Sequence, residues 1–388
     1  MAVTVQGILN AAFPAYAATH RLPRHVHKAV RALRRCRTGA LGHNAVTCTA
    51  GHVLAVRRNS CRHRVCPQCG WRKAQQWLER WQARLLPVTH FHGIFTVASE
   101  LHLLWRWNRK RFADVLFQAA RDALFTLLGQ DRHLGACPGL ALALHTWGSA
   151  LPIHLHLHGL LTAGGLDARG KWVATRPNFL IWGPLLRDAF RDTLLAGLRR
   201  LLDQGLLDLP PTLTVADVRT LLAQLGQVPW HVRIEPPYAS GRGLVVYLAR
   251  YLRGGPIKNH RLVDFTGTEV SFRYRDRRGR KHPKWRPITL PVEEFLDRLF
   301  QHVPVPGLQM VRAYGLYGRH QRAALQHCRL QLQLQPDWQQ PPPAPPAAPH
   351  CPQCGATLVV VVARTPVPPR PYSQMPMGPG PPVLARSN

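Results

Sequence analysis

The stretch Ile153–Thr162 reads IHLHLHGLLT, and its first six residues alternate strictly between apolar side chains and histidine. In an extended strand this alternation sends the apolar side chains to one face and His154, His156 and His158 to the other. Histidines two residues apart lie about 6.5 to 7 Å apart along a strand, so two imidazoles can converge on one metal ion. The stretch therefore predicts a strand with its apolar face in a core and a metal site on its histidine face. A surface strand with solvated histidines is the alternative.

Lysine and arginine outnumber the acidic residues in this 388-residue chain by 51 to 19, which gives a formal net charge of +32 at pH 7. Such an excess of cations indicates a polyanionic partner, first of all nucleic acid. An acidic membrane is the competing partner, but the sequence has no apolar run of about 18 residues, no lipidation motif and no secretory leader. We therefore expect a DNA-binding protein of the cytoplasm, associated with the nucleoid and not with membranes.

A second pattern lies between Thr47 and Arg72, where four cysteines have the spacing C-x12-C-x4-C-x2-C. A Cys-Pro-Gln-Cys-Gly turn joined by two further thiols is typical of a tetrahedral, structural Zn²⁺ site. The predicted ligands are Cys48, Cys61, Cys66 and Cys69. His52 and His63 are alternative ligands, of which at most one should displace a cysteine, because structural sites close at four. Four unrelated buried thiols are the other interpretation.

Arginines surround the cysteine pattern. They are Arg57, Arg58, Arg62, Arg64 and Arg72. A module stiffened by zinc that presents these cations to DNA phosphates is the natural interpretation. A basic helix is predicted at Val26–Arg37, where Val30, Leu33 and Cys36 recur at helical spacing. This helix is either solvated or a further contact with the DNA backbone.

A tyrosine pair marks the segment Ser240–His260, SGRGLVVYLARYLRGGPIKNH. Its first serine can cap a helix, and the Gly-Gly-Pro sequence can end it. Tyr247 and Tyr251 are four residues apart, so both phenols project from the same helical face, flanked by Arg250 and Arg253. An aromatic pair at this spacing can also be core packing. The other pair, at positions 314 and 317, has no histidine cluster near it in the sequence and is predicted to be structural.

The C-terminal part contains a second, incomplete cysteine pattern. Cys351 and Cys354 repeat the CPQC turn and could form half of a zinc site, with Cys328 and either His327 or His350 as partners. The segments 339–349 and 366–388 are rich in proline and are predicted to be disordered.

Three motifs in order, NSCRHRVCPQC, H-x-H-x-HG and YLARYLRGGP, resemble the transposases of the insertion-sequence-ninety-one family. This is the two-tyrosine HUH class, named for its histidine-hydrophobe-histidine motif, which moves DNA by a rolling-circle route. The resemblance covers about residues 39–330. It places the four predicted cysteines in the family's zinc-binding region, His156 and His158 on its metal motif, and Tyr247 and Tyr251 on its paired nucleophiles. Family members commonly have proline where this chain has Leu155, which lies outside the ligand pair.

The resemblance and the strand and helix patterns together predict an α+β protein, with an HUH endonuclease domain built on an antiparallel sheet with helices. We expect a basic N-terminal module at 1–90, with the zinc-binding region at about 40–75. The catalytic domain is expected at 91–265 and a basic C-terminal region at 266–335. The proline-rich tail with its CxxC turn is expected at 336–388.

A phenol with a pKa near 10 is a poor nucleophile at neutral pH, so tyrosine attack on a phosphodiester needs an activated phosphate. A divalent cation, Mg²⁺ or Mn²⁺, held by His156 and His158 would polarise a phosphate oxygen. His154, Glu235 and His92 are candidates for a third ligand. Lys258 could stabilise a phenolate or the leaving oxygen, or could contact the DNA backbone.

The predicted function is therefore that of a transposase that nicks and rejoins single-stranded DNA at element ends through a covalent 5′-phosphotyrosine. A rolling-circle replication initiator or relaxase would share this chemistry but would act at a plasmid or phage origin. A non-catalytic zinc-finger protein that binds nucleic acid is the alternative without an enzyme activity.

Overall fold

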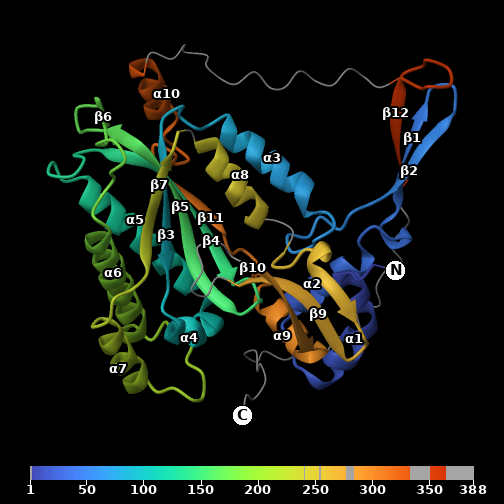
Figure 1. The fold of residues 1–388 in the computed structure, drawn as a ribbon, viewed down its shortest axis with the longest axis horizontal. Helices are drawn as coiled ribbons and strands as arrows, with labels where there is room; N and C mark the ends of the chain where they lie inside the picture. Colours follow the sequence, from blue (N-terminus) through green and yellow to red (C-terminus); the bar gives the residue numbers. More distant parts are fainter. Residues whose placement is uncertain (1, 240, 253–254, 277–283, 333–349, 364–388) are drawn as a thin grey trace. The chain divides into compact units, whose positions relative to one another are not determined.

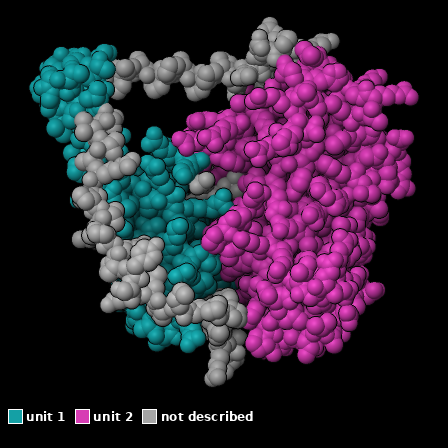
Figure 2. All heavy atoms as spheres, turned by 180° about the vertical axis from the view of Figure 1, so that it is seen from behind, with its two compact units in different colours: residues 1–73, 253–303, 341–388 teal, residues 74–252, 304–340 magenta. Residues whose placement is uncertain are grey.

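The computed structural model describes residues 2–239, 241–252, 255–276, 284–332 and 350–363 (Figure 1). The chain divides into two compact units, shown in different colours in Figure 2. Unit 1 comprises residues 1–73, 253–303 and 341–388, and unit 2 comprises 74–252 and 304–340. The two proline-rich segments that were predicted to be disordered lie outside the described residues.

This division differs from the continuous domains expected from the sequence. Residues 253–303 return to the N-terminal helices instead of forming a separate C-terminal region. Val5 donates its N–H to the Asn259 side chain over 3.2 Å, and Phe13 packs edge-on against Phe300 with ring centroids 5.8 Å apart. These contacts join segments about 250 to 290 positions apart in the sequence, and local patterns carry no information at that distance.

Unit 2 is built on an antiparallel sheet with the strand order β11-β4-β5-β3-β7. The strands are β3 (His90–Thr96), β4 (Cys137–Trp147), β5 (Ile153–Leu166), β7 (Val232–Tyr238) and β11 (Val311–Gly315), and the short β6 (Trp172–Ala174) pairs with β5. The histidine stretch thus forms the middle strand, as its alternation predicted, and its leucines Leu155 and Leu157 are fully buried.

Three helices cover the apolar face of this sheet: α5 (Arg109–Leu128), α6 (Gly183–Asp203) and α7 (Val215–Leu225), which packs against α6 (Figure 1). Phe95 on this face packs against Phe190 of α6, with ring centroids 5.1 Å apart. Helix α8 (Gly241–Leu252) lies against β3, β4, β5 and β7. The remaining elements of this unit are η2 (Ser99–Leu101), α4 (His102–Trp107), α10 (Arg322–Gln331) and most of α3 (Gly70–Gln82).

Unit 1 contains two small groups of elements. The first packs α1 (Val5–Thr19), α2 (Arg24–Arg35) and α9 (Val292–Gln301) with a sheet of order β10-β9-β8. Its strands are β8 (Leu262–Phe265), β9 (Glu269–Asp276) and β10 (Lys284–Pro291), with the single turns η1 (Gly39–Leu41) and η3 (Asn259–Arg261) nearby in the chain. Phe272 of β9 and Phe295 of α9, with ring centroids 5.8 Å apart, form its core.

The second group is a three-stranded sheet of order β12-β1-β2, formed by β1 (His43–Cys48), β2 (Val53–Arg58) and β12 (Leu358–Ala363). The chain as a whole is therefore an α+β protein with antiparallel sheets, which confirms the predicted fold class. Among the described residues, no helix has both the length and the apolar character needed to cross a membrane.

Candidate active site and metal centres

Three histidines from the two central strands meet on the face of the sheet opposite α5 and α6. His145 of β4 stands directly opposite His156 of β5 in the antiparallel register, and His158 follows two residues later on the same face. The Nε2 atoms of His156 and His158 are 3.1 Å apart, and the ligand atoms of all three residues lie within 4.8 Å of one another. All three side chains are buried. The group is hence a buried cluster of nitrogen donors and not a solvated histidine stripe.

Hydrogen bonds orient two of these rings. The Nδ1–H of His156 donates to the backbone carbonyl of His154 over 2.8 Å, so the lone pair of the neutral ring is on Nε2. The Nδ1 of His158 lies 2.8 Å from Nε2 of His92, so His158 can donate there and turn its own Nε2 toward His156. Such contacts to the second ring nitrogen are what fixes the orientation of metal-binding histidines.

Burial favours the neutral form of two imidazoles at this site, those of His145 and His92. Burial, with the proximity of His156 and His92 as lesser causes, lowers the pKa of His145 well below the usual value for histidine. Burial likewise lowers the pKa of His92 to about 4. A neutral imidazole carries the lone pair that a metal ion requires.

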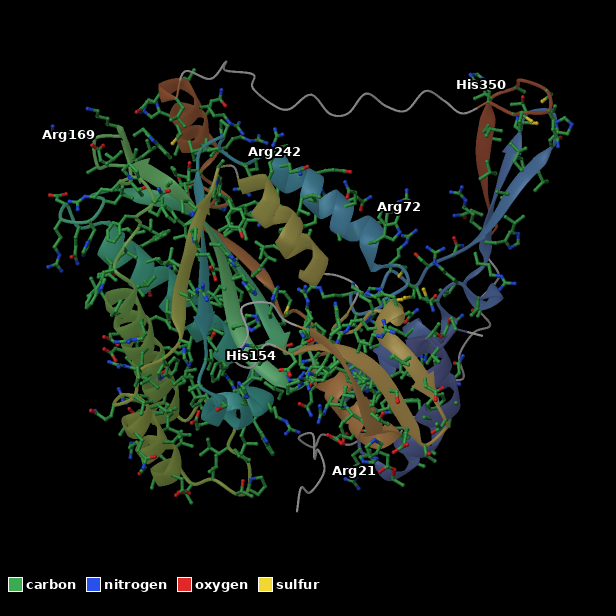
Figure 3. All side chains as sticks on the ribbon, viewed as in Figure 1. Arg21, Arg72, His154, Arg169, Arg242 and His350 are labelled. Atoms are coloured by element: carbon green, nitrogen blue, oxygen red, sulfur yellow. The ribbon has the colours of Figure 1, made fainter. Side chains whose placement is uncertain are left out.

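The third member of the group is not one of the candidates predicted from the sequence. His154 is exposed at the beginning of β5 (Figure 3), and Glu235 of β7 forms an ion pair with Arg233 at 3.0 Å. His92 lies behind His158 as a hydrogen-bond partner. The signal that could have found His145 was the pairing of two consecutive predicted strands. Once the tight turn at 148–152 joins them as a hairpin, its register sets position 145 opposite 156.

The tyrosine helix lies on this same face of the sheet. A side-chain carbon at Gly241, where α8 begins, would stand 3.0 Å from the ring of His90, which shares its face of β3 with His92. Leu244, Val245 and Leu248 of α8 are buried against the sheet. Positions 247 and 251 both belong to α8, one turn apart, as predicted. The side chains of Tyr247, Arg250 and Tyr251, and the whole of Arg253, lie outside the described part of the chain.

Tyr317, of the second tyrosine pair, packs inside the core of unit 2. Tyr317 is fully buried, and its hydroxyl lies 2.7 Å from Nε2 of His90 and accepts the N–H of Leu86 at 3.1 Å. Burial raises the pKa of this phenol, which makes it a poorer nucleophile than a solvated tyrosine.

Four cysteines in unit 1 form a tetrahedral set, and one of them differs from the prediction. Cys36, Cys61, Cys66 and Cys69 have their sulfur atoms within 4.8 Å of one another. Cys61 and Cys69 are 3.6 Å apart, and Cys66 and Cys36 are 3.5 Å apart. Four sulfurs about 2.3 Å from one zinc ion would be about 3.8 Å apart, so the set fits Zn²⁺. Hydrogen bonds from the Cys61 and Cys66 thiols lower the pKa of Cys69, as thiolate formation requires.

Cys36 takes the position expected for Cys48. The N–H of Arg37 donates to the carbonyl of Asn59 over 3.0 Å, which sets Cys36 beside Cys61. Cys48 is instead the last residue of the six-residue strand β1, about 17 Å along the strand from its first residue, His43. His43 pairs with Arg58, which comes three positions before Cys61. The far end of β1 is therefore distant from the four-cysteine set. In the sequence Cys36 stood only as an apolar position of the predicted basic helix, at helical spacing with Val30 and Leu33, and not as a metal ligand.

The predicted basic residues have different surroundings. Arg57, Arg58, Arg62 and Arg72 are exposed, with Arg72 on α3 (Figure 3), while Arg64 is half-buried. Lys258 is also half-buried: burial lowers its pKa, and the nearby Cys66 thiolate partly opposes this effect. Its ammonium group therefore lies where it can offset the negative charge of a zinc ion held by four thiolates.

Comparisons with known proteins agree with this geometry. Residues 8–97 match the family described as "Transposase zinc-binding domain", and residues 139–324 match the family described as "Putative transposase". The chain is 34% identical over 322 residues to "Putative transposase y4qJ" of Sinorhizobium fredii, covering 81% of this chain and 80% of that protein. It is also 34% identical over 292 residues to the "Transposase for insertion sequence element IS801" of Pseudomonas savastanoi pv. phaseolicola, covering 72% and 67% of the two chains. No solved structure matches.

The sheet with its histidine cluster, the cysteine module and these matches define the protein as a transposase. The chain belongs to the insertion-sequence-ninety-one (IS91) family, with a structural zinc-binding module at its N-terminus. The predicted family is confirmed.

We expect Cys36→Ser to remove about one zinc ion per chain and to unfold the segment around α2 and the CPQC turn. A structural zinc ion contributes its binding free energy to folding, so the loss should amount to several kcal/mol. Elemental analysis of the purified full chain, together with thermal melting, measures both effects. Cys137→Ser, a change at an exposed cysteine outside the cluster, is the matched control. Retention of all zinc by Cys36→Ser would restore Cys48 as the fourth ligand.

Proposed function

We propose that this transposase nicks and rejoins single-stranded DNA at the ends of its mobile element, through a covalent 5′-phosphotyrosine on α8. The observation that carries the proposal is the position of the histidine cluster. His145, His156 and His158 occupy the sheet face against which α8 packs, and α8 contains positions 247 and 251. The proposal takes the cluster as the cation site and α8 as the nucleophile helix because both lie on one face of one sheet.

The three histidines fit a divalent cation. Their donor atoms converge, and the 3.1 Å between Nε2 of His156 and Nε2 of His158 is close to the spacing of about 3.0 Å for adjacent ligands of an octahedral ion. Imidazole donors suit transition metal ions, whereas Mg²⁺ and Mn²⁺ also accept the oxygen ligands that water and a phosphate would add. When bound, the cation would polarise a non-bridging oxygen of the phosphate and offset the charge that develops on it.

The tyrosines would carry the covalent step. The phenolic oxygen attacks phosphorus and loses its proton, a tyrosine–phosphate ester forms at the 5′ side of the break, and the 3′ oxygen leaves with a proton as a free hydroxyl. Because one ester replaces another, the phosphoester bond energy is retained. The 3′-hydroxyl of another strand can then attack the tyrosine–phosphate ester, which joins the two strands and releases the tyrosine. Two tyrosines one helical turn apart would allow one DNA end to be held while a second is cut.

Incubating the purified protein and Mn²⁺ with single-stranded DNA from the ends of its own element tests the proposal. A denaturation-resistant protein–DNA adduct, absent in the presence of a chelator, is the expected result. Single strands from a plasmid origin serve as the comparison and distinguish a replication initiator. Binding of all these DNAs without any adduct would support the non-catalytic alternative, and equal cleavage with and without chelator would overturn the role given to the histidines.

DNA affinity should depend strongly on salt. The net charge of +32 includes the exposed Arg57, Arg58, Arg62 and Arg72, which we propose contact phosphates together with Arg64, Arg250, Arg253 and Lys258. Each single-strand phosphate neutralised releases counterions, so the logarithm of the affinity should fall with the logarithm of the salt concentration by about 0.7 per contact. Titrations by fluorescence anisotropy from 50 to 300 mM salt, roughly the range where counterion release dominates, measure the slope. An affinity that does not change with salt concentration would show that the positive charge does not serve DNA binding.

A further inference from the structure

We propose that the chain holds a second structural zinc ion, between the N-terminal hairpin and the C-terminal CPQC turn. Its ligands are Cys48, His52, Cys351 and Cys354, whose donor atoms lie within 4.8 Å of one another. Two of these residues lie outside the matched zinc-binding domain at 8–97. The sequence had indicated Cys328, His327 and His350 as partners of the C-terminal cysteines, but Cys328 is buried in the core of unit 2, while Cys351 belongs to unit 1.

The distances fit a tetrahedral site with three sulfur ligands and one nitrogen ligand. The Sγ atoms of Cys48 and Cys354 are 3.6 Å apart, and Nδ1 of His52 lies 3.5 Å from Sγ of Cys48 and 3.7 Å from Sγ of Cys351. Zinc bonds of about 2.3 Å to sulfur and about 2.0 to 2.1 Å to nitrogen require ligand separations of about 3.8 Å between sulfurs and about 3.6 Å between sulfur and nitrogen. The observed spacings therefore match both kinds of pair.

Two tight turns present these ligands. In the first, the N–H of His52 donates to Sγ of Cys48 over 3.3 Å, and Gly51 has a positive φ of 87° that lets the chain reverse. In the second, the N–H of Gly355 donates to the carbonyl of Cys351 over 2.8 Å, and Gly355 has a φ of 69°. Turns of this kind point two ligands in one direction and leave amide N–H groups near the sulfur atoms, as in zinc knuckles.

The sheet brings the two turns together. Strand β12 pairs with β1 over its whole length, from Leu358 opposite Cys48 to Ala363 opposite His43. This register puts the turn before β12 beside the turn after β1, at the same end of the sheet. The ligands are thereby joined although Cys48 and Cys354 are 306 positions apart in the sequence.

The described side chains of this sheet form little apolar core. Among its described strand and turn residues, only Cys48 and Cys351 are buried, and Val53 and Val56 are each 61% exposed. The apolar contacts of the described side chains offset little of the entropy of bringing such distant segments together. A metal ion bound by both turns supplies that free energy, as it does in small zinc domains.

The two zinc sites differ in their ligands, which makes them separable. The first has four thiolates, and the second has three thiolates and one imidazole. Elemental analysis of the purified full chain should give two zinc ions per chain, and Cys354→Ser should reduce this to about one. The double variant Cys36→Ser with Cys354→Ser should retain none. His350→Ala and Cys137→Ser, which change residues outside both groups, should keep two.

The conservative variant His52→Cys replaces one zinc ligand by another, so its result does not depend on a general loss of folding. It should keep two metal ions, and after substitution with Co²⁺ the sulfur-to-metal charge-transfer absorption should increase over wild type, because a thiolate replaces the imidazole. One zinc ion per wild-type chain would overturn the proposal. So would two zinc ions in Cys354→Ser, or a cobalt spectrum that His52→Cys leaves unchanged.

Discussion

His158→Ala is expected to reduce the rate of single-stranded DNA cleavage by about 10²- to 10³-fold or more, while DNA affinity stays within a fewfold of wild type. The loss corresponds to several kcal/mol of transition-state stabilisation, since each 1.36 kcal/mol is tenfold in rate. His145→Ala and His156→Ala should behave in the same way, because all three donor atoms belong to one cluster. Single-turnover cleavage at several Mn²⁺ concentrations, combined with anisotropy binding assays, separates the two quantities.

His154→Ala is the matched control for this series. It removes an exposed imidazole whose ring lies against that of His156, with centroids 4.7 Å apart, but whose nitrogens are not among the converging donors. The backbone carbonyl that orients His156 is kept, so the rate should remain close to wild type. His92→Ala should have an intermediate effect, with the cation requirement raised about 10- to 100-fold, because His92 orients the ring of His158. A large loss with His154→Ala and none with His145→Ala would exchange the roles of these two residues.

The double variant Tyr247→Phe with Tyr251→Phe is expected to form no covalent adduct. Removing both phenolic oxygens removes the atoms that would bond to phosphorus, so no adjustment of the site can compensate. Each single variant should keep an adduct at the remaining tyrosine but should fail in transposition, which needs two sequential strand exchanges. Denaturing gels detect the adduct, and peptide mass spectrometry identifies the attached residue.

Tyr314→Phe provides a control at a half-buried tyrosine outside α8 and should leave adduct formation unchanged. Attachment of DNA at Tyr314 or Tyr317 would show that α8 is not the nucleophile helix. Attachment through a 3′-phosphate would place the enzyme in a different class, even with the correct tyrosine.

The features that depend on local periodicity could be predicted from the sequence. Alternation identified β5 and the face on which His156 and His158 lie, and the spacing and end signals identified α8. The CPQC turn at Cys66 and Cys69 identified half of a zinc site. Strand and helix geometry repeats every two or 3.6 residues, so a few neighbouring side chains are enough to fix it.

The features that depend on distant segments were decided only by the tertiary structure. The register of the β4–β5 hairpin made His145 the third member of the histidine cluster. The backbone hydrogen bond from Arg37 to Asn59 placed Cys36, and not Cys48, in the four-cysteine set. The pairing of β12 with β1 brought Cys48 beside Cys351 and Cys354, in the turn before β12 and more than 300 positions away. A thiol or an imidazole becomes a ligand only where several others stand within a few ångströms, and chain spacing does not determine that proximity once a loop separates the ligands. The sequence by itself therefore determined which side chains can bind metal, and the packing of distant segments decided which of them share an ion.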